Sequence, residues 1–220
     1  MVKKLILLSG PSGVGKGPIV DWLKKLYFPA LLEGKDIPEF CQVPVRRLKT
    51  EHHKGTEPEI GFEGMSLANY QFYCRGNIQA IDVKQLDHAL ATHDTVLIEA
   101  YRKPFDFLQE HYGSLVKFLP TFVSPVDLDD HDAVEQAPDI MLDALVRRAL
   151  FRDSKNVTKR LMGELAERAE DCANDLTVAK RYTNVIVNSC YECDSRWYFP
   201  KLTGEPRKTV DRLYDIIHNG

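Results

Sequence analysis

The chain has 220 residues, a length that fits one large domain with small insertions and allows a sizeable buried core. Hydrophobic residues make up 44% and charged residues 28%, with no low-complexity tract, which argues against a disordered chain. The 29 basic and 32 acidic residues give a net charge of −3, which disfavours nucleic acid as the main partner.

The N-terminus carries a short apolar run that covers only positions 5 to 8 before Ser9, so we interpret it as a buried strand and not as a signal peptide. No stretch approaches the roughly 18 apolar residues of a membrane-spanning helix. We therefore expect a cytoplasmic protein with no membrane partner. The five cysteines form an odd and scattered set, which argues against a disulfide framework. Cys190 and Cys193 form one C-x-x-C pair, for which reduced thiols are the favoured interpretation and a zinc site is the alternative.

Apolar runs and amphipathic segments alternate along most of the chain. A strand that ends at Ser9 is followed by a Gly-rich turn and by a helix with apolar positions from Ile19 to Leu26. Further buried strands are predicted over 94–101, 113–123 and 183–189. Helices are predicted over 83–91, 104–111, 139–151, 155–181 and 208–218. This alternation favours an α/β fold, a three-layer α/β/α arrangement with a parallel core sheet.

Two regions interrupt the alternation. Residues 34–78 are rich in charge, Gly and Pro with interspersed aromatic residues, which predicts an inserted lobe that covers the substrate. Residues 127–138 carry many carboxylates around His131. We interpret this acidic run as a solvated loop, with a cation site as the alternative.

The turn after the first strand has the composition of a phosphate-binding loop. Residues 10–16 read GPSGVGK, match G-x-x-x-x-G-K, and stand between a strand and a helix that begins near Lys16. Glycines let consecutive backbone N–H groups point at phosphate oxygens, and the helix adds its positive end. Lys16 is expected to bridge the outer phosphates. The predicted nucleotide-binding residues of the loop are Gly10, Pro11, Ser12, Gly13, Val14, Gly15, Lys16 and Gly17, and a chance Gly-rich turn is the alternative.

The residue after the lysine departs from the usual motif. Ser or Thr is expected there as a magnesium ligand, but the chain has Gly17 followed by Pro18. Magnesium can still be held by two phosphates and water, because it keeps much of its hydration shell. We therefore expect ATP and Mg²⁺ as cofactors, a weakened catalysis, and no metal site made by the protein itself.

The stretch LLSGPSGVGKG resembles the guanylate kinase family of nucleoside monophosphate kinases. Further similarities follow in the family's order at 76–101, 145–171 and 182–189. The resemblance implies a P-loop NTPase fold in one domain over 1–220, with an acceptor-binding lobe and a helical lid. Its expected parts are a core at about 1–33, 94–126 and 180–220, the lobe at about 34–93 and the lid at about 138–160. The implied activity is phosphoryl transfer from ATP to a nucleoside monophosphate, most simply GMP.

The resemblance also implies roles for single residues. Arg148, Arg152 and Arg160 match the lid positions, where guanidinium groups suit phosphate oxygens and act with Lys16, although arginines also solvate helix faces. Asn188 ends the last core strand near the place where the family holds adenine, but an Asn at a strand end is also a turn former.

The acceptor site is matched less closely. Arg46 and Arg47, with Lys49 as a possible partner in the same role, lie near the family's clamp for the acceptor phosphate, and Glu99 stands where the family has an acceptor-facing aspartate.

The family's Tyr-Gly-Ser or Tyr-Gly-Thr is replaced here by residues 78–81. Where the family has a guanine-reading glutamate, this chain has Tyr70, Gln71 and Tyr73 instead. Tyr70 is a candidate for stacking on a base, although alternate aromatic residues also mark one face of a strand. Three functions stay open: a GMP kinase, a related kinase with another phosphorylated acceptor, and a non-catalytic binding module. The expected partners are small-molecule nucleotides, and the chain is expected to be a monomer or a homodimer.

Overall fold

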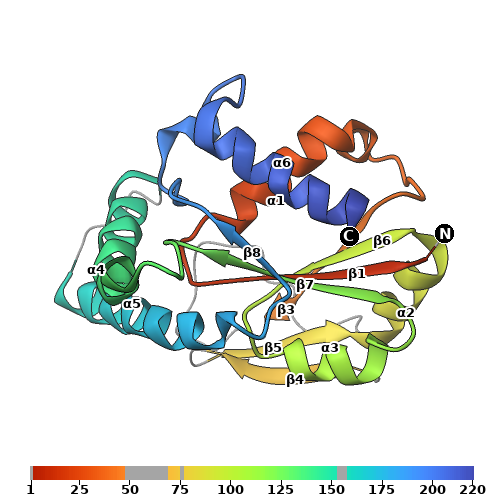
Figure 1. Cartoon of the computed structure of the whole chain (residues 1–220), viewed down its shortest axis with the longest axis horizontal. Coiled ribbons are helices and arrows are strands. Elements are labelled where there is room, and N and C mark those ends of the chain that lie inside the picture. Colours follow the sequence, from red (N-terminus) through yellow and green to blue (C-terminus); the bar gives the residue numbers. More distant parts are fainter. Residues whose placement is uncertain (1, 48–68, 75–76, 153–157) are drawn as a thin grey trace. The chain divides into compact units, whose positions relative to one another are not determined.

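The structure of this protein is a computed structural model that describes residues 2–47, 69–74, 77–152 and 158–220 (Figure 1). Its central sheet is parallel, is flanked by helices, and has the strand order β2, β6, β1, β7, β8. These strands are β1 (Lys4–Ser9), β2 (Cys41–Val43), β6 (Thr95–Glu99), β7 (Lys117–Ser124) and β8 (Asn184–Val187). The predicted α/β fold with a parallel core sheet is confirmed.

The chain divides into two compact units, which we describe separately. One comprises Met1–Leu7 with Asp36–Leu119, and the other comprises Leu8–Lys35 with Pro120–Gly220. β1 contributes residues to both, and its positions Leu5 to Leu8 are fully buried. A strand covered on both faces reads as a continuous apolar run, which is why the sequence alone predicts it.

The first unit contains a second, antiparallel sheet of three strands in the order β3 (Arg46–Arg47), β5 (Asn77–Asp82) and β4 (Asn69–Cys74). α2 (Val83–Thr92) begins after Asp82, whose carboxylate accepts a hydrogen bond from the backbone N–H of Gln85 at 3.2 Å. α3 (Phe105–Tyr112) follows β6. Both helices confirm their predicted ranges, whereas the three-residue strand β2 gives too short a pattern to be predicted.

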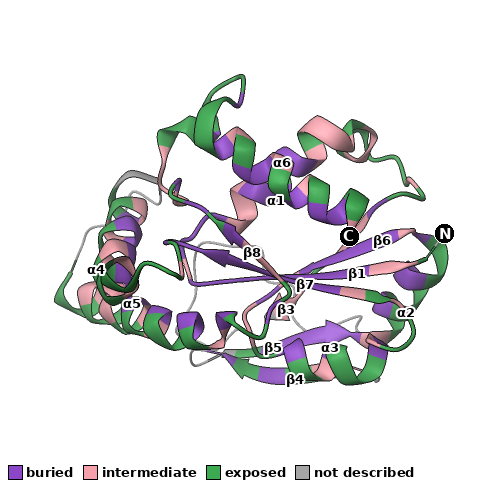
Figure 2. Cartoon of the chain, viewed as in Figure 1, coloured by how far each residue is buried: buried purple, intermediate pink, exposed green. Residues whose placement is uncertain are grey.

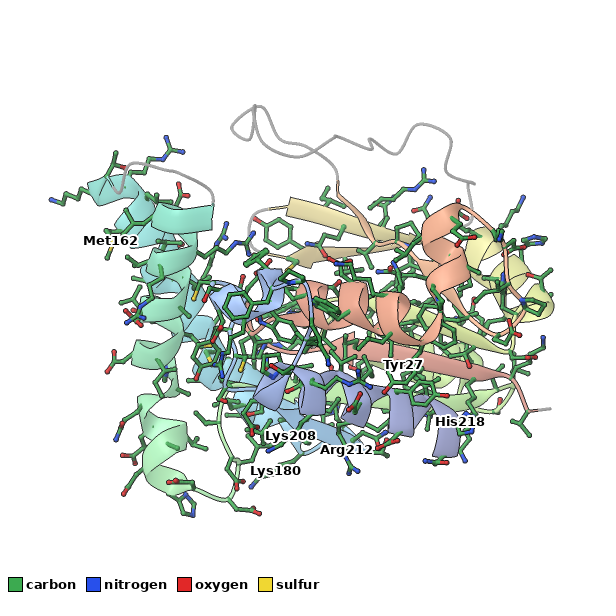
Figure 3. The ribbon with its side chains drawn as sticks, turned by 90° about the horizontal axis from the view of Figure 1, so that it is seen from above. Tyr27, Met162, Lys180, Lys208, Arg212 and His218 are labelled. Atoms are coloured by element: carbon green, nitrogen blue, oxygen red, sulfur yellow. The ribbon has the colours of Figure 1, made fainter. Side chains whose placement is uncertain are left out.

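The second unit contains the longest helices. They are α1 (Lys16–Tyr27), α4 (His131–Arg147), α5 (Lys159–Ala179) and α6 (Gly204–Asn219), with the short turns η1 (Pro29–Glu33), η3 (Arg148–Arg152) and η4 (Ser195–Tyr198). α1 packs along α6, and α4 packs along α5. Figure 2 shows buried positions running along both α1 and α6. Tyr27, labelled in Figure 3, stacks on Tyr214 of α6 with ring centroids 3.7 Å apart.

Several predicted boundaries are wrong. α6 begins at Gly204 and not at 208. α4 begins at His131 and not at 139, so most of the acidic run is helical and only its first residues form a loop. Asp130 caps the helix by accepting a hydrogen bond from the backbone N–H of Ala133 at 3.0 Å, and acidic groups near a helix N-terminus are stabilised by its dipole. The strand predicted over 113–123 begins at Lys117, because the preceding residues form a turn that is hydrogen bonded to Tyr112.

None of the helices within the described ranges combines the length and the apolar character needed to cross a bilayer.

Candidate functional site

The loop between β1 and α1 is shaped by glycines that leave no room for side chains. Gly10 has φ 142°, and a Cβ atom there would lie 2.3 Å from the carbonyl oxygen of Val123. Gly15 has φ 100°, and its Cβ would lie 2.7 Å from Nδ2 of Asn188. Both values of φ belong to the left-handed half of conformational space, which only glycine adopts readily. These two glycines therefore let the loop backbone lie directly against β7 and against the side chain of Asn188, an approach that any side chain would prevent.

Lys16 begins α1 and folds back over this loop. Its Nζ donates hydrogen bonds to the carbonyl oxygens of Gly10 and Pro11, both at 2.8 Å. The ammonium group is thereby held beside the backbone turn and the positive end of α1. This arrangement of glycine-rich turn, helix N-terminus and ammonium group suits an anion such as phosphate.

The two residues after Lys16 are Gly17 and Pro18, and neither carries the hydroxyl group that is usual at this point of the motif. A Cβ at Gly17 would meet nothing within 4 Å, so space does not exclude a larger residue there. Pro18 lies in the first turn of α1, where the missing N–H costs no helical hydrogen bond. The chain thus offers a phosphate cradle without the hydroxyl that usually binds magnesium.

Asn188, which follows β8, contacts the backbone of the loop through its side chain. It is fully buried, and its Nδ2 donates to the carbonyl oxygens of Val14 at 2.7 Å and Cys190 at 2.8 Å. Its Oδ1 accepts from the N–H of Cys190 at 3.2 Å and from the hydroxyl of Thr209 at 3.3 Å. The amide of Asn188 therefore uses its full hydrogen-bonding capacity to tie the loop to α6.

The segment after Asn188 also packs against the loop, a role that was not predicted from the sequence. The N–H of Glu192 donates to the carbonyl oxygen of Gly13 at 2.9 Å. Trp197 is almost fully buried, and its Nε1 donates to the carbonyl oxygen of Cys190 at 2.9 Å. Trp22 of α1 in turn donates through Nε1 to the carbonyl oxygen of Trp197 at 2.8 Å. The tryptophan and its aromatic neighbours Tyr198 and Phe199 are the sequence features that indicate a packing role for this segment.

The predicted lid arginines have different surroundings. Arg148, at the start of η3, donates from Nη1 to Oε2 of Glu192 at 2.5 Å, and both side chains are largely buried. Arg160 forms an exposed ion pair with Glu164 at 3.1 Å, one helical turn away. The side chain of Arg152 falls outside the described residues. Among the described side chains, Arg148 is thus the predicted lid arginine that the structure links to the phosphate loop, through Glu192.

The C-x-x-C pair lies in the same segment and remains a pair of thiols. Burial raises the pKa of both the Cys190 and the Cys193 thiol, which favours the protonated form over the thiolate that zinc requires. Across the described part of the chain, no three His, Cys, Asp or Glu side chains are grouped so as to hold a metal ion.

The predicted acceptor residues belong to the other unit. Arg46 lies on β3 opposite Ala80 of β5, and Glu99 is the half-buried last residue of β6. The ring of Tyr70 stacks on Phe107 of α3, with centroids 4.0 Å apart and planes 7° from parallel. One face of Tyr70 is therefore covered, a contact that the sequence did not predict. Lys49 and the side chain of Arg47 fall outside the described residues.

No protein-family model and no curated protein sequence matches this chain. Among solved structures, the crystal structure of guanylate kinase from Anaplasma phagocytophilum is similar, with a TM-score of 0.52 and 15% sequence identity. The similarity covers 99% of this chain and 86% of that chain. At this identity it shows the fold alone, and the predicted guanylate kinase-like α/β fold is thereby confirmed.

Proposed function

We propose that this chain is a phosphotransferase that transfers a phosphoryl group from ATP to a nucleoside monophosphate, in the simplest case GMP. The observation that carries the proposal is the loop over residues 10–17, a glycine-rich turn at a helix N-terminus with the ammonium group of Lys16 beside it. The fold similarity to a guanylate kinase supports the same activity.

The chemistry of the proposed reaction fits what these residues can do. ATP supplies the transferred group, and its magnesium ion neutralises part of the charge. Phosphoryl transfer needs positioning and charge neutralisation, with little covalent help from the protein. Lys16 would exchange the carbonyl oxygens of Gly10 and Pro11 for phosphate oxygens. Asn188 would keep the loop in shape from below, and lid arginines would neutralise the moving charge.

In the same proposal the first unit holds the acceptor. Arg46 and Arg47 would bind the acceptor phosphate, and Glu99 would accept hydrogen bonds from the acceptor. Tyr70 would contribute an aromatic surface, but Phe107 already covers one face of its ring. This contact favours, as a second candidate, a related kinase whose phosphorylated acceptor carries no stacked guanine.

The first experiment is an equilibrium titration of ADP and ATP, with and without Mg²⁺, by calorimetry. We expect both nucleotides to bind and adenosine to bind at least about tenfold more weakly, because one good charge-assisted phosphate contact contributes about 1.5 kcal/mol or more. Lys16→Ala is the test variant, and Lys25→Ala, at an exposed position of the same helix, is the control. A wild-type chain that binds neither nucleotide contradicts the proposal.

The second experiment offers ATP, Mg²⁺ and a panel of monophosphates and follows ADP release. Turnover with GMP supports the proposed reaction, and turnover with another acceptor supports the second candidate. Nucleotide binding without turnover above the Lys16→Ala variant supports a non-catalytic binding module, for which Gly17 in place of a hydroxyl residue is the relevant observation.

A further inference from the structure

Glu192 makes two contacts that the proposed function does not explain. Its backbone N–H donates to the carbonyl oxygen of Gly13 in the phosphate loop at 2.9 Å. Its side-chain Oε2 accepts a hydrogen bond from Nη1 of Arg148 at 2.5 Å. One residue thus joins the loop to an arginine that comes from a distant part of the sequence.

The pair differs from an ordinary surface ion pair. The side chains of Arg148 and Glu192 are 23% and 14% exposed. By contrast, Arg147 pairs with Asp143 on the same helix, and both of those side chains are 61% exposed. Exposed pairs contribute little, whereas a largely desolvated pair has a defined geometry and is costly to break. The two neighbouring arginines therefore provide a matched comparison at the junction of α4 and η3.

Glu192 itself is held in place by its surroundings. The hydroxyl of Tyr198 donates to its carbonyl oxygen at 3.3 Å, and the buried Trp197 fixes the adjacent backbone. The carboxylate is therefore presented from a rigid segment. A guanidinium has five N–H donors in a planar fork, so it can bind a carboxylate and a phosphate oxygen at the same time.

We propose that Glu192 is a positioning residue that holds the guanidinium of Arg148 at the phosphate loop, ready to bind the phosphates of the nucleotide. This inference rests on the proposed function. An arginine on a helix end loses rotamer freedom when it binds a ligand, and a carboxylate that already fixes its orientation reduces that loss. The carboxylate also repels phosphate, but the guanidinium that it binds offsets this charge.

The test is a double-mutant cycle on ADP affinity, measured by calorimetry with Glu192→Gln, Arg148→Gln and the double variant. Glu192→Gln keeps the size of the side chain and leaves the backbone contact with Gly13 possible. We expect it to weaken ADP binding about tenfold, within the range for residues of one network. The double variant should bind no more weakly than Arg148→Gln alone, because Glu192 acts through Arg148. Asp143→Asn is the matched control and should leave the affinity unchanged.

Three results would overturn the inference: wild-type affinity in Glu192→Gln, losses that add in the double variant, or tighter binding in Glu192→Gln, which would make the carboxylate a restraint on the arginine. The wild-type titration separates this failure from failure of the proposed function, because a chain that binds no ADP refutes both. Should Glu192→Gln fail to fold, Glu192→Asp replaces it in the cycle. It keeps the charge on a shorter side chain, and either binding equal to wild type or losses that add in the double variant would again refute the inference.

Discussion

The phosphate loop and the predicted acceptor residues are held by different kinds of interaction. In the loop, Gly10 and Gly15 adopt positive φ angles that set the path of the backbone, and the side-chain amide of Asn188 donates a hydrogen bond to the carbonyl oxygen of Val14. In the other unit, Arg46 and Tyr70 project from strands, and the surroundings of Tyr70 depend on the packing of Phe107. Backbone geometry tolerates few substitutions, whereas strand side chains can change without changing the fold. A chain can therefore keep its phosphate site while its acceptor specificity changes.

The largest effect is expected for Gly10→Ala. Its Cβ would collide with the carbonyl oxygen of Val123, so we expect a loss of roughly 3 kcal/mol in the free energy of unfolding, at the upper end of common single substitutions. ADP binding should be lost with it. Urea unfolding and calorimetry measure the two effects. Gly17→Ala is the control, because its Cβ meets nothing within 4 Å and its effect should stay within about 0.5 kcal/mol.

Asn188→Ala tests whether the anchor under the loop is needed. The substitution removes the Asn188 donor from the carbonyl oxygen of Val14 and leaves that of Cys190 with its bond from Trp197 alone, which costs about 2 kcal/mol in the free energy of unfolding. We also expect weaker ADP binding. Asn184→Ala is the matched control, since that side chain is only half-buried and bonds to its neighbour Thr183. Unchanged ADP affinity in Asn188→Ala would show that the loop keeps its shape without this amide.

Gly17→Ser restores the missing hydroxyl in a position with open space. We expect the Mg²⁺ concentration that gives half of the maximal rate of ADP release to fall about tenfold, equivalent to about 1.4 kcal/mol in the free energy of Mg²⁺ binding. Gly17→Ala separates the hydroxyl from the effect of an added methyl group. An equal response of the two variants would mean that magnesium is bound by the nucleotide and water alone.

Phe107→Ala tests the acceptor side. It removes the stack on Tyr70, and aromatic pairs of this kind contribute about 1 kcal/mol to stability beyond their buried area. The uncovered ring should lower the KM for a purine monophosphate while ADP affinity stays the same. Tyr70→Phe keeps the stack and serves as the control. A change in ADP affinity would contradict an effect limited to the acceptor residues.

The smallest effect concerns pH and the segment next to the loop. Two hydrogen bonds from the Arg196 guanidinium hold the pKa of Asp194 below its usual range. A lowered pKa in the folded state stabilises the fold above the unfolded pKa of about 3.9, and this contribution is lost as the pH falls through the folded value. The free energy of unfolding should therefore differ between wild type and Asp194→Asn by about 1 kcal/mol at pH 7.

The difference in the free energy of unfolding should stay constant down to about pH 4 and decrease toward zero at lower pH. Urea unfolding at several pH values measures it. A difference that persists at the lowest pH would assign the effect to packing and not to the charge of Asp194.

Local patterns predicted those parts of the fold that a short stretch of chain specifies. Continuous apolar runs predicted β1 and β6, and helical periodicity predicted α2, α3 and α6. The start of α4 was not predicted because many carboxylates and a proline, Pro138, are typical of loops. The hydrogen bond by which Asp130 caps the helix forms only in the folded chain. The strand β2 was missed because three residues pair with β6 without a pattern of their own.

The sequence by itself determined the phosphate loop, because its glycines, its lysine and the following helix are consecutive, and steric limits on φ act within a few residues. Only the tertiary structure decided which distant groups surround that loop. Asn188, Glu192 and Arg148 are brought to it by packing, and Phe107 is brought to Tyr70 in the same way. Such contacts depend on how buried elements fit together, and no periodicity along the chain encodes them.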